Sequence, residues 1–327
     1  MRALVTGAAG FIGAHVTRAL TTAGFEVVAF DLFFPDAVDL PDGVERVQGD
    51  ILDRDTVASA MLGCTAIFHL AAVYSYRRAD AQLMQRVNVE GTRTLLAAAL
   101  RGQKRRLVHT SSCATCGPVP DRPATEADAP GAQELSIPYR RTKLEGERLA
   151  LGAASAGLEV VVVNPTVPVG PGDLRPTPTG KMVADVASGR ARGYLANSAL
   201  NVVAVEDVAA GHVRAFEHGR SGERYLLGGE NLTVQDVFAT VAAAAGRSAP
   251  RVAVPWGTAY AAARVAGAAL RPLRREPRLL LPDEVRSGRL PHLFDDGKAR
   301  QELGHVSRPA REALASAALS ALAAESA

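Results

Sequence analysis

A tyrosine and a lysine four residues apart form the most chemically specific pair in the chain. They are Tyr139 and Lys143, in the segment YRRTK, and the chain of 327 residues contains only four lysines. Residues i and i+4 share one face of a helix, so the ammonium group can lie beside the phenol. A nearby cation lowers the pKa of a phenol, which is otherwise about 10. The pair therefore predicts a proton-transfer site in which Tyr139 is the acid or base and Lys143 stabilises its phenolate.

A serine is the candidate for holding the oxygen of a substrate. Ser112 closes the run Thr110-Ser111-Ser112, 27 residues before Tyr139, at the predicted end of a strand. The carboxyl ends of strands in doubly wound sheets face the crevice where ligands bind. Serines at strand ends are also common turn residues. Ser112 is therefore a catalytic candidate only together with the Tyr139–Lys143 pair.

A glycine-rich turn near the start of the chain predicts a binding site for a dinucleotide. Gly7, Gly10 and Gly13 are spaced as G-x-x-G-x-x-G between a predicted strand and a predicted helix, with Phe11 and Ile12 between them. Glycines let backbone N–H groups approach a pyrophosphate, and the start of the helix supplies partial positive charge. The alternative is a tight strand-to-helix turn that binds no ligand. An acidic residue after the second strand argues against this alternative.

That acidic residue is Asp31, which lies 18 residues after Gly13 at the predicted end of the second strand. A carboxylate at this place accepts hydrogen bonds from the ribose hydroxyls of adenosine and repels a 2′-phosphate. The next residues, Leu32-Phe33-Phe34, contain no base. NAD is therefore the expected cofactor rather than NADP, and an aspartate that merely ends the strand is the alternative.

Short β-rich runs alternate with helical patterns through the first half of the chain, which indicates βαβ units and a parallel sheet. The expected fold class is α/β: a Rossmann-type doubly wound parallel sheet with a smaller, mostly helical C-terminal substrate lobe. The first domain is expected at residues 1–165, with 200–220 returning to it, and the lobe at 166–199 and 221–327. The predicted strands are 3–5, 26–30, 44–48, 66–69, 106–110 and 159–163, and the predicted helices 11–23, 53–61, 81–100 and 138–154.

The alternation of strand and helix patterns stops after Pro165. Residues 167–180 hold four prolines and three glycines, which predicts an irregular crossing loop. Further on, Thr233 is expected to cap a helix over 234–245. The segment Arg271–Arg278 is expected to be a short basic linker.

The composition excludes several classes of protein. Hydrophobic residues make up 47% and charged residues 22%, which predicts a globular chain. The net charge is only +3, so we expect no strong positive electrostatic potential that would attract nucleic acid. Three cysteines are too few for a disulfide framework and favour the cytoplasm. Cys113 and Cys116 form a C-x-x-C without a second ligand pair, so we expect packing and no metal. The apolar helix at 256–270 is too short to span a membrane, and packing is preferred to a role at a membrane surface.

The order and spacing of these motifs resemble the extended short-chain dehydrogenase/reductase family, also called the NAD-dependent epimerase/dehydratase family. The resemblance runs from Ala3 to about Gly229. The segments that carry it are 6–13, Asp31, GDI at 49–51, HLAA at 69–72, NVEGT at 88–92, TSS at 110–112, Tyr139 with Lys143, and Pro165 with Gly170-Pro171.

The resemblance implies a role for each matching residue. Tyr139 would be the proton donor and acceptor, Lys143 its partner and a ribose ligand, and Ser112 the catalytic hydroxyl. Tyr74 follows a strand end that faces substrate in this fold and is a candidate substrate contact, the alternative being an exposed loop. A small-molecule substrate and a homodimer through two helices are also implied. The remaining cofactor contacts are Asp50 and Ile51 at the adenine, Leu70, Ala71 and Ala72 along the middle of the cofactor, Asn88 in its pocket, and Pro165 and Val167 at the nicotinamide.

The sequence indicates the family more clearly than it indicates the reaction. Residues 164–171 and 225–233 look most like hopanoid-associated sugar epimerases, which are similar to dihydroflavonol-reductase-like enzymes. Nucleotide-sugar epimerases usually have an asparagine in place of Val167 and an arginine within the stretch that here is 200–207, and this chain has neither. A sugar or sugar-like epimerase is the first interpretation, an NAD(P)-dependent ketone reductase or alcohol dehydrogenase the second, and a non-catalytic dinucleotide sensor the third.

Overall fold

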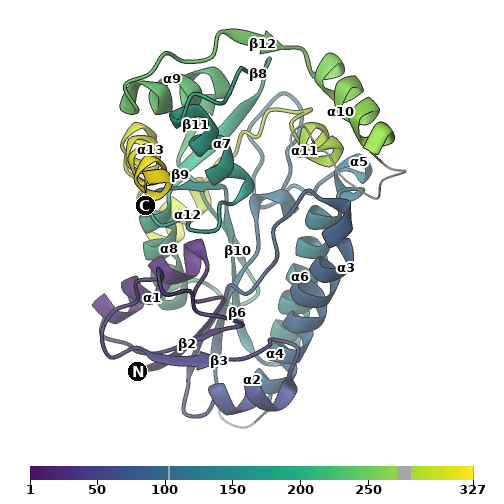
Figure 1. Cartoon of the computed structure of the whole chain (residues 1–327). Helices are drawn as coiled ribbons and strands as arrows, with labels where there is room; N and C mark the ends of the chain where they lie inside the picture. The colour runs from purple at the N-terminus through teal and green to yellow at the C-terminus, as the bar shows by residue number, and fades with distance from the viewer. Residues whose placement is uncertain (102–103, 271–280, 327) are drawn as a thin grey trace.

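Seven parallel strands form the central sheet, in the order β10-β6-β5-β4-β1-β2-β3 (Figure 1). The computed structural model describes residues 1–101, 104–270 and 281–326. The strand order reverses between β1 and β4, where a doubly wound sheet opens a crevice at its carboxyl edge. The predicted α/β class is thereby confirmed. The strands are β1 (Arg2–Thr6), β2 (Glu26–Asp31), β3 (Glu45–Gln48), β4 (Ala66–His69), β5 (Arg106–Thr110), β6 (Glu159–Pro165) and β10 (Arg224–Leu227).

Helices cover both faces of this sheet, and each face has its own hydrophobic core. Successive side chains of a strand point to opposite faces, so Val5 packs into one core and Leu4 into the other. Because both faces are covered, the strands are continuous apolar runs, which made them predictable. One face carries α1 (Phe11–Thr22), α8 (Val205–His218) and α12 (Gly297–Leu303), and the other α2 (Arg54–Ala60), α4 (Thr92–Ala99) and α6 (Pro138–Ser155).

The helix predicted at residues 81–100 is present, but its winding changes in the middle. α3 (Ala81–Met84) passes into a π-helical segment, Gln85–Gly91, which continues into α4. The wider turn carries Asn88, whose Oδ1 accepts from the N–H of Val73 at 2.7 Å and whose Nδ2 donates to the Val73 carbonyl at 3.0 Å. Such segments often occur at functional sites, and this one fixes the loop after β4.

The second lobe is built on a three-stranded sheet, ordered β11-β9-β7, and a two-stranded sheet of β12 and β8. It lies above the central sheet in the view of Figure 1. Its strands are β7 (Val167–Val169), β8 (Gly193–Leu195), β9 (Ala199–Ala204), β11 (Glu230–Thr233) and β12 (Val252–Val254), and its helices are α7 (Pro178–Ala187), α9 (Val234–Ala244), α10 (Trp256–Leu270), α11 (Pro282–Ser287) and α13 (Ala310–Ser326).

The boundary between the two parts differs from the prediction. Of residues 200–220, α8 and Val203 of β9 pack into the core of the first domain, whereas β9 pairs with β7 and β11 in the sheet of the lobe. Instead β10, which was expected in the lobe, pairs with β6 at the edge of the central sheet. A short apolar run indicates a buried strand but not its partner, so the sequence could not distinguish these two strands.

The crossing loop expected at 167–180 is partly regular. It contains β7, and its end forms the first turn of α7 with Pro178 at a position where a proline nitrogen needs no hydrogen bond. The expected cap of α9 is confirmed, since Thr233 Oγ1 accepts from the N–H of Asp236 at 3.1 Å. The basic linker Arg271–Arg278 lies outside the described residues. Within the described part of the chain, no helix has both the length and the apolarity to cross a membrane.

Candidate active site

A cavity of about 220 Å³ at the carboxyl ends of the central strands gathers most of the residues singled out by the sequence. Its walls come from the glycine loop, the ends of β4, β5 and β6, and the first turn of α6. Segments far apart in the sequence thus meet at the place where doubly wound sheets bind ligands. The predicted residues that line it are Gly7, Gly10, Phe11, Ile12, Gly13, Leu70, Ala72, Tyr74, Ser112, Tyr139, Lys143, Pro165 and Val167.

The other predicted residues lie behind or beside this lining. Ile51 is buried and packs against Gly91, and Asn88 anchors the loop after β4. Asp50 is exposed and accepts from the N–H of Leu52 at 2.9 Å. Their contacts with a cofactor stay predictions. The predicted residues outside the lining are Asp31, Asp50, Ile51, Ala71 and Asn88.

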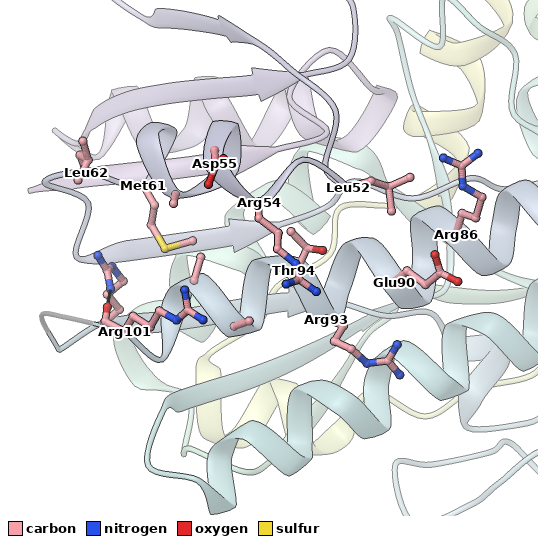
Figure 2. Close-up of a pocket in the computed structure, with 14 residues that line it drawn as sticks. Leu52, Arg54, Asp55, Met61, Leu62, Arg86, Glu90, Arg93, Thr94 and Arg101 are labelled. Atoms are coloured by element: carbon pink, nitrogen blue, oxygen red, sulfur yellow. Dashed lines mark hydrogen bonds between the residues drawn. The ribbon is translucent and has the colours of Figure 1, made fainter.

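A larger groove, of about 910 Å³, lies between α2 and α4 (Figure 2). It is rich in charge but contains none of the predicted site residues, and its described lining residues include no tyrosine–lysine pair. The cavity at the strand ends is therefore the candidate active site. The arginines of the groove are Arg54, Arg86, Arg93, Arg101 and Arg105.

The glycine loop forms a cradle with no space for side chains. A Cβ on Gly7, whose φ is +71°, would come within 2.7 Å of the Ala71 nitrogen, and one on Gly13 would lie 1.9 Å from the Gly7 carbonyl oxygen. α1 follows with Gly10 as its N-cap and without a side-chain cap from any described residue. Its first N–H groups are therefore available to an anion. The loop fits the pyrophosphate of NAD.

Asp31 is held beside this loop at the end of β2. Its Oδ2 accepts from the N–H of Ala9 at 2.9 Å, and its Oδ1 accepts from the N–H of Leu32 at 2.8 Å. Burial raises the pKa of Asp31, while these backbone hydrogen bonds act in the opposite direction. The N–H of Phe33 also contributes a backbone hydrogen bond, and a carboxylate has about four lone-pair sites, so capacity remains for a ribose hydroxyl.

The predicted catalytic groups lie together on the cavity wall. Lys143 is 6% exposed, and its Nζ donates to the Thr110 carbonyl at 2.7 Å. Burial lowers the pKa of Lys143 to about 8, against the opposing effect of Glu147. Burial also raises the pKa of Tyr139, whereas a hydrogen bond with Ser112 lowers it. Without a cofactor the phenol is therefore protonated at neutral pH, the form needed to act as an acid.

Tyr74 and Tyr76 form an aromatic wall next to Tyr139. The ring centroids of Tyr74 and Tyr139 are 4.3 Å apart, with the planes inclined by 34°. Tyr74 donates to the Tyr76 hydroxyl at 3.4 Å, which in turn lies 3.1 Å from Ser287 Oγ in the lobe. Burial raises the pKa of Tyr74 well above its usual value, so its phenol stays neutral. The substrate contact expected of Tyr74 stays a prediction, and its ring adjoins that of Tyr139.

Arg140, which follows Tyr139, joins the first domain to the lobe. Its Nε pairs with Glu134 of α5 (Ala132–Leu135) at 3.1 Å, and one terminal nitrogen donates to the Gly117 carbonyl at 2.8 Å. The other terminal nitrogen lies 2.8 Å from Ser287 Oγ and 3.0 Å from His292 Nε2. Burial, reinforced by Arg140, lowers the pKa of His292 to about 3, so this ring is neutral. Each of the three guanidinium nitrogens thus has at least one protein partner.

Two other chemically suggestive sets of side chains are buried and unreactive. Burial raises the pKa of Cys113 to about 11, and that of Cys116 still further. Protonated thiols are poor nucleophiles and metal ligands, which supports the packing interpretation of the C-x-x-C. Burial lowers the pKa of His69 to about 3, and its ring nitrogens lie within hydrogen-bond distance of Thr6 and Thr92. His69 is thus a packed core residue.

Sequence reasoning missed four polar residues near the cavity: Arg140, Glu147, Asn164 and His292. Glu147 had a detectable signal, since it continues the four-residue spacing of Tyr139 and Lys143. His292 had none, because its contact with Arg140 spans 152 residues and depends on how the lobe folds.

Comparison with known proteins agrees with the motifs. The model of the NAD dependent epimerase/dehydratase family matches residues 3–228. A Synechocystis sp. protein with the provisional name dihydroflavonol 4-reductase is 36% identical, over 96% of this chain and 92% of its own. Sterol demethylase protein B from Methylococcus capsulatus is 36% identical over 97% of each chain. The crystal structure of gox2253 is 37% identical with a TM-score of 0.82, over 97% of each chain. The chain belongs to the NAD-dependent epimerase/dehydratase family, the extended short-chain dehydrogenases/reductases, whose cofactor is NAD.

Proposed function

We propose that this enzyme reduces an apolar ketone to a secondary alcohol with NADH, or runs the reverse oxidation, rather than epimerising a nucleotide sugar. The observation that carries the proposal is that the cationic side chains of the cavity already have protein partners. Arg140 and Lys143 are the charged groups among its described lining residues. Arg140 is held by Glu134 and the lobe, and Lys143 by Thr110. A nucleoside diphosphate needs cations or free N–H groups for its charge, and it would have to compete with the protein partners that both of these cations already have.

The start of α7, which borders the cavity, also disfavours an anionic substrate. Thr177 caps this helix by accepting from the N–H of Gly180 at 3.0 Å. The Asp173 carboxylate in turn accepts from the hydroxyl of Thr177 at 2.7 Å and from its N–H at 3.0 Å. The favourable end of the helix dipole is thus already occupied by a carboxylate, which repels a second anion.

The remaining lining suits an apolar substrate. Tyr74, Val167, Pro168 and Phe294 present aromatic and aliphatic surface beside Tyr139. Apolar pockets with a few placed polar groups are typical of small-molecule sites. Two relatives carry names that refer to a dihydroflavonol and a sterol. Both names support a ring-containing ketone or alcohol as the substrate class.

Within this proposal each of the three predicted catalytic residues has one role. NAD, when bound, supplies or accepts the hydride. The Ser112 hydroxyl donates to the substrate oxygen and orients it, and Tyr139 gives its proton to that oxygen during reduction. The positive charge of Lys143 stabilises the phenolate that remains. In oxidation the same groups act in reverse, with the phenolate of Tyr139 as the base.

The test is to follow NADH consumption with 1-tetralone, a dihydroflavonol and a 3-oxosteroid, and to assay UDP-glucose in parallel. We expect one or more of the apolar ketones to be reduced by the wild type, and none by Tyr139→Phe, which should still bind NADH. Denaturing the purified enzyme should release far less than one NAD per chain, because a reductase exchanges its cofactor. Conversion of UDP-glucose without net use of NADH, together with stoichiometric released NAD, would instead show an epimerase.

The homodimer and the cytoplasmic location expected from the sequence stay predictions. Light scattering of the purified protein tests the first, because a dimer has twice the 34.2 kDa mass of the chain.

A further inference from the structure

A buried carboxylate lies on the catalytic face of α6. Glu147 follows Tyr139 and Lys143 at intervals of four residues, which puts the three on one side of the helix. Glu147 is 1% exposed, and a carboxylate so deeply buried is tolerated only with good partners. Its Oε1 accepts from Arg224 at 2.6 Å. Its Oε2 accepts from the hydroxyl of Thr115 and from Nδ2 of Asn164, both at 2.7 Å.

Both partners of Oε2 also contact the backbone of Ser112. Asn164 Nδ2 donates to the Ser112 carbonyl at 3.1 Å. The N–H of Thr115 donates to the same carbonyl at 3.0 Å, and Thr115 Oγ1 lies 2.9 Å from it. The Ser112 hydroxyl accepts from the N–H of Ala114 at 3.2 Å, so its direction depends on this turn. Two residues thus connect the glutamate to the serine.

The orientation of Asn164 shows what the network favours. Its amide nitrogen serves the Ser112 carbonyl, Thr115 Oγ1 and Glu147 Oε2, whereas its Oδ1 is buried without a hydrogen-bond partner among the described residues. A buried, unsatisfied oxygen destabilises the fold. Reversing the amide would point an acceptor at a carbonyl and a carboxylate. Glu147 and the turn at residues 112–115, here called the serine turn, therefore together fix the orientation of the Asn164 amide.

We propose that Glu147 is a positioning residue for Ser112, acting through Asn164 and Thr115 to aim the hydroxyl that holds the substrate oxygen. The inference rests on the proposed function for the role of that hydroxyl, but not for the network itself. The other oxygen of Glu147 belongs to the ion pair with Arg224, whose guanidinium group otherwise donates to the carbonyls of Glu126 and Asp128; no hydrogen bond between described residues joins it to Ser112 or Thr115. The two oxygens of one carboxylate therefore have separable roles.

Three variants separate these roles. Glu147→Gln disturbs both oxygens, and Arg224→Gln is the matched control that disturbs only the ion pair. The double variant, Glu147→Gln with Arg224→Gln, removes the uncompensated buried charge that either single change leaves. Each is assayed for thermal stability, NADH affinity, and kcat and KM with 1-tetralone and NADH, or with whichever ketone of the panel above the wild type reduces.

A positioning role predicts that stability and turnover respond differently. Both single variants should unfold at lower temperature, and the double variant should recover much of that loss. The kcat should fall about ten- to a hundredfold in Glu147→Gln and in the double variant, the range expected when a reacting group is misplaced by about 1 Å. It should stay near the wild-type value in Arg224→Gln, and NADH affinity should not change. Recovery of kcat together with stability in the double variant would overturn the proposal.

A crystal structure of Glu147→Gln provides a result that does not need a substrate. The Ser112 hydroxyl should turn away from Tyr139, with the Asn164 amide reoriented. If the wild type reduces no ketone but the hydroxyl moves in this way, the proposed function fails while the positioning role stands. If the serine turn and the direction of the Ser112 hydroxyl are unchanged from the wild type, the positioning role is overturned, whatever the substrate is.

Discussion

Replacing Lys143 by methionine should separate catalysis from stability. Tyr139 and Lys143 are i and i+4 on α6, which puts their Cβ atoms about 5–6 Å apart, and about 6 Å is assumed between the phenol oxygen and Nζ. At an effective dielectric constant of about 20, a unit charge at that distance contributes about 3 kcal/mol. This equals about two pKa units. Lys143→Met should therefore raise the pKa of Tyr139 in the enzyme with NAD bound by about two units, and slow alcohol oxidation at neutral pH about 100-fold.

The same change should not destabilise the protein. Burial lowers the pKa of Lys143 from 10.5 to about 8, which makes its charged form cost about 3 kcal/mol of folding free energy. Because the pKa is lower in the folded state, this penalty is complete below about pH 8 and disappears as the pH rises through the unfolded value. Methionine loses only the hydrogen bond to Thr110, worth about 1.5–3 kcal/mol for a charged donor. The two effects offset each other.

The assay is the rate of alcohol oxidation with NAD between about pH 6 and about pH 10, the range in which groups such as Lys143 titrate. The melting temperature of the cofactor-free protein is measured for the same variants. Lys298→Met is the control, because Lys298 pairs with Glu223 and does not line the cavity. We expect the Lys143→Met profile to move to higher pH at an almost unchanged melting temperature. A melting temperature lowered by more than about 5 °C, with an unmoved profile, would show that the lysine only supports the fold.

Further predictions concern the cofactor and the pH dependence. Asp31→Asn removes a charge that repels a 2′-phosphate, so the affinity for NADPH relative to NADH should rise at least about tenfold in a fluorescence titration; an unchanged ratio contradicts the ribose role. Gly13→Ala places a Cβ 1.9 Å from the Gly7 oxygen and should abolish NADH binding, whereas Gly152→Ala, with nothing within 4 Å, should not. Ketone reduction should fall as the pH rises through about 8, because the pKa of Lys143 is lowered to about 8 and its charge is lost above that value; a flat profile through this range argues against an electrostatic role.

The parts that could be predicted from the sequence are those fixed by local rules. Tyr139 and Lys143 share a face because of the helical period, and Gly7 and Gly13 are required by a turn in which any Cβ would collide with backbone. The strands of the central sheet are apolar runs because both faces of the sheet are buried. In each case the evidence lies within one or two elements of the chain.

The parts that could not be predicted depend on contacts between distant segments. Nothing local indicates that β10 pairs with β6 while β9 joins the lobe, because both are short apolar runs. Asn201, in the stretch 200–207 that lacks the arginine usual in nucleotide-sugar epimerases, accepts from the N–H of Gly229 at 2.8 Å and donates to Asn231 Oδ1 at 2.9 Å. Its role in joining β9 to β11 appears only once those strands are adjacent.

The first turn of α6 links the chemistry of the site to its selectivity. Consecutive helical residues point about 100° apart, so Tyr139 faces the cavity while Arg140 reaches Ser287 and His292 in the lobe. Arg140, the cation next to Tyr139 in the sequence, thus joins α6 to the lobe. Freeing it for a diphosphate would break that junction and leave Glu134 buried without its ion-pair partner. The proposed preference for an uncharged substrate is therefore coupled to the way the two parts of the molecule are held together, and a single substitution in the pocket should not convert it.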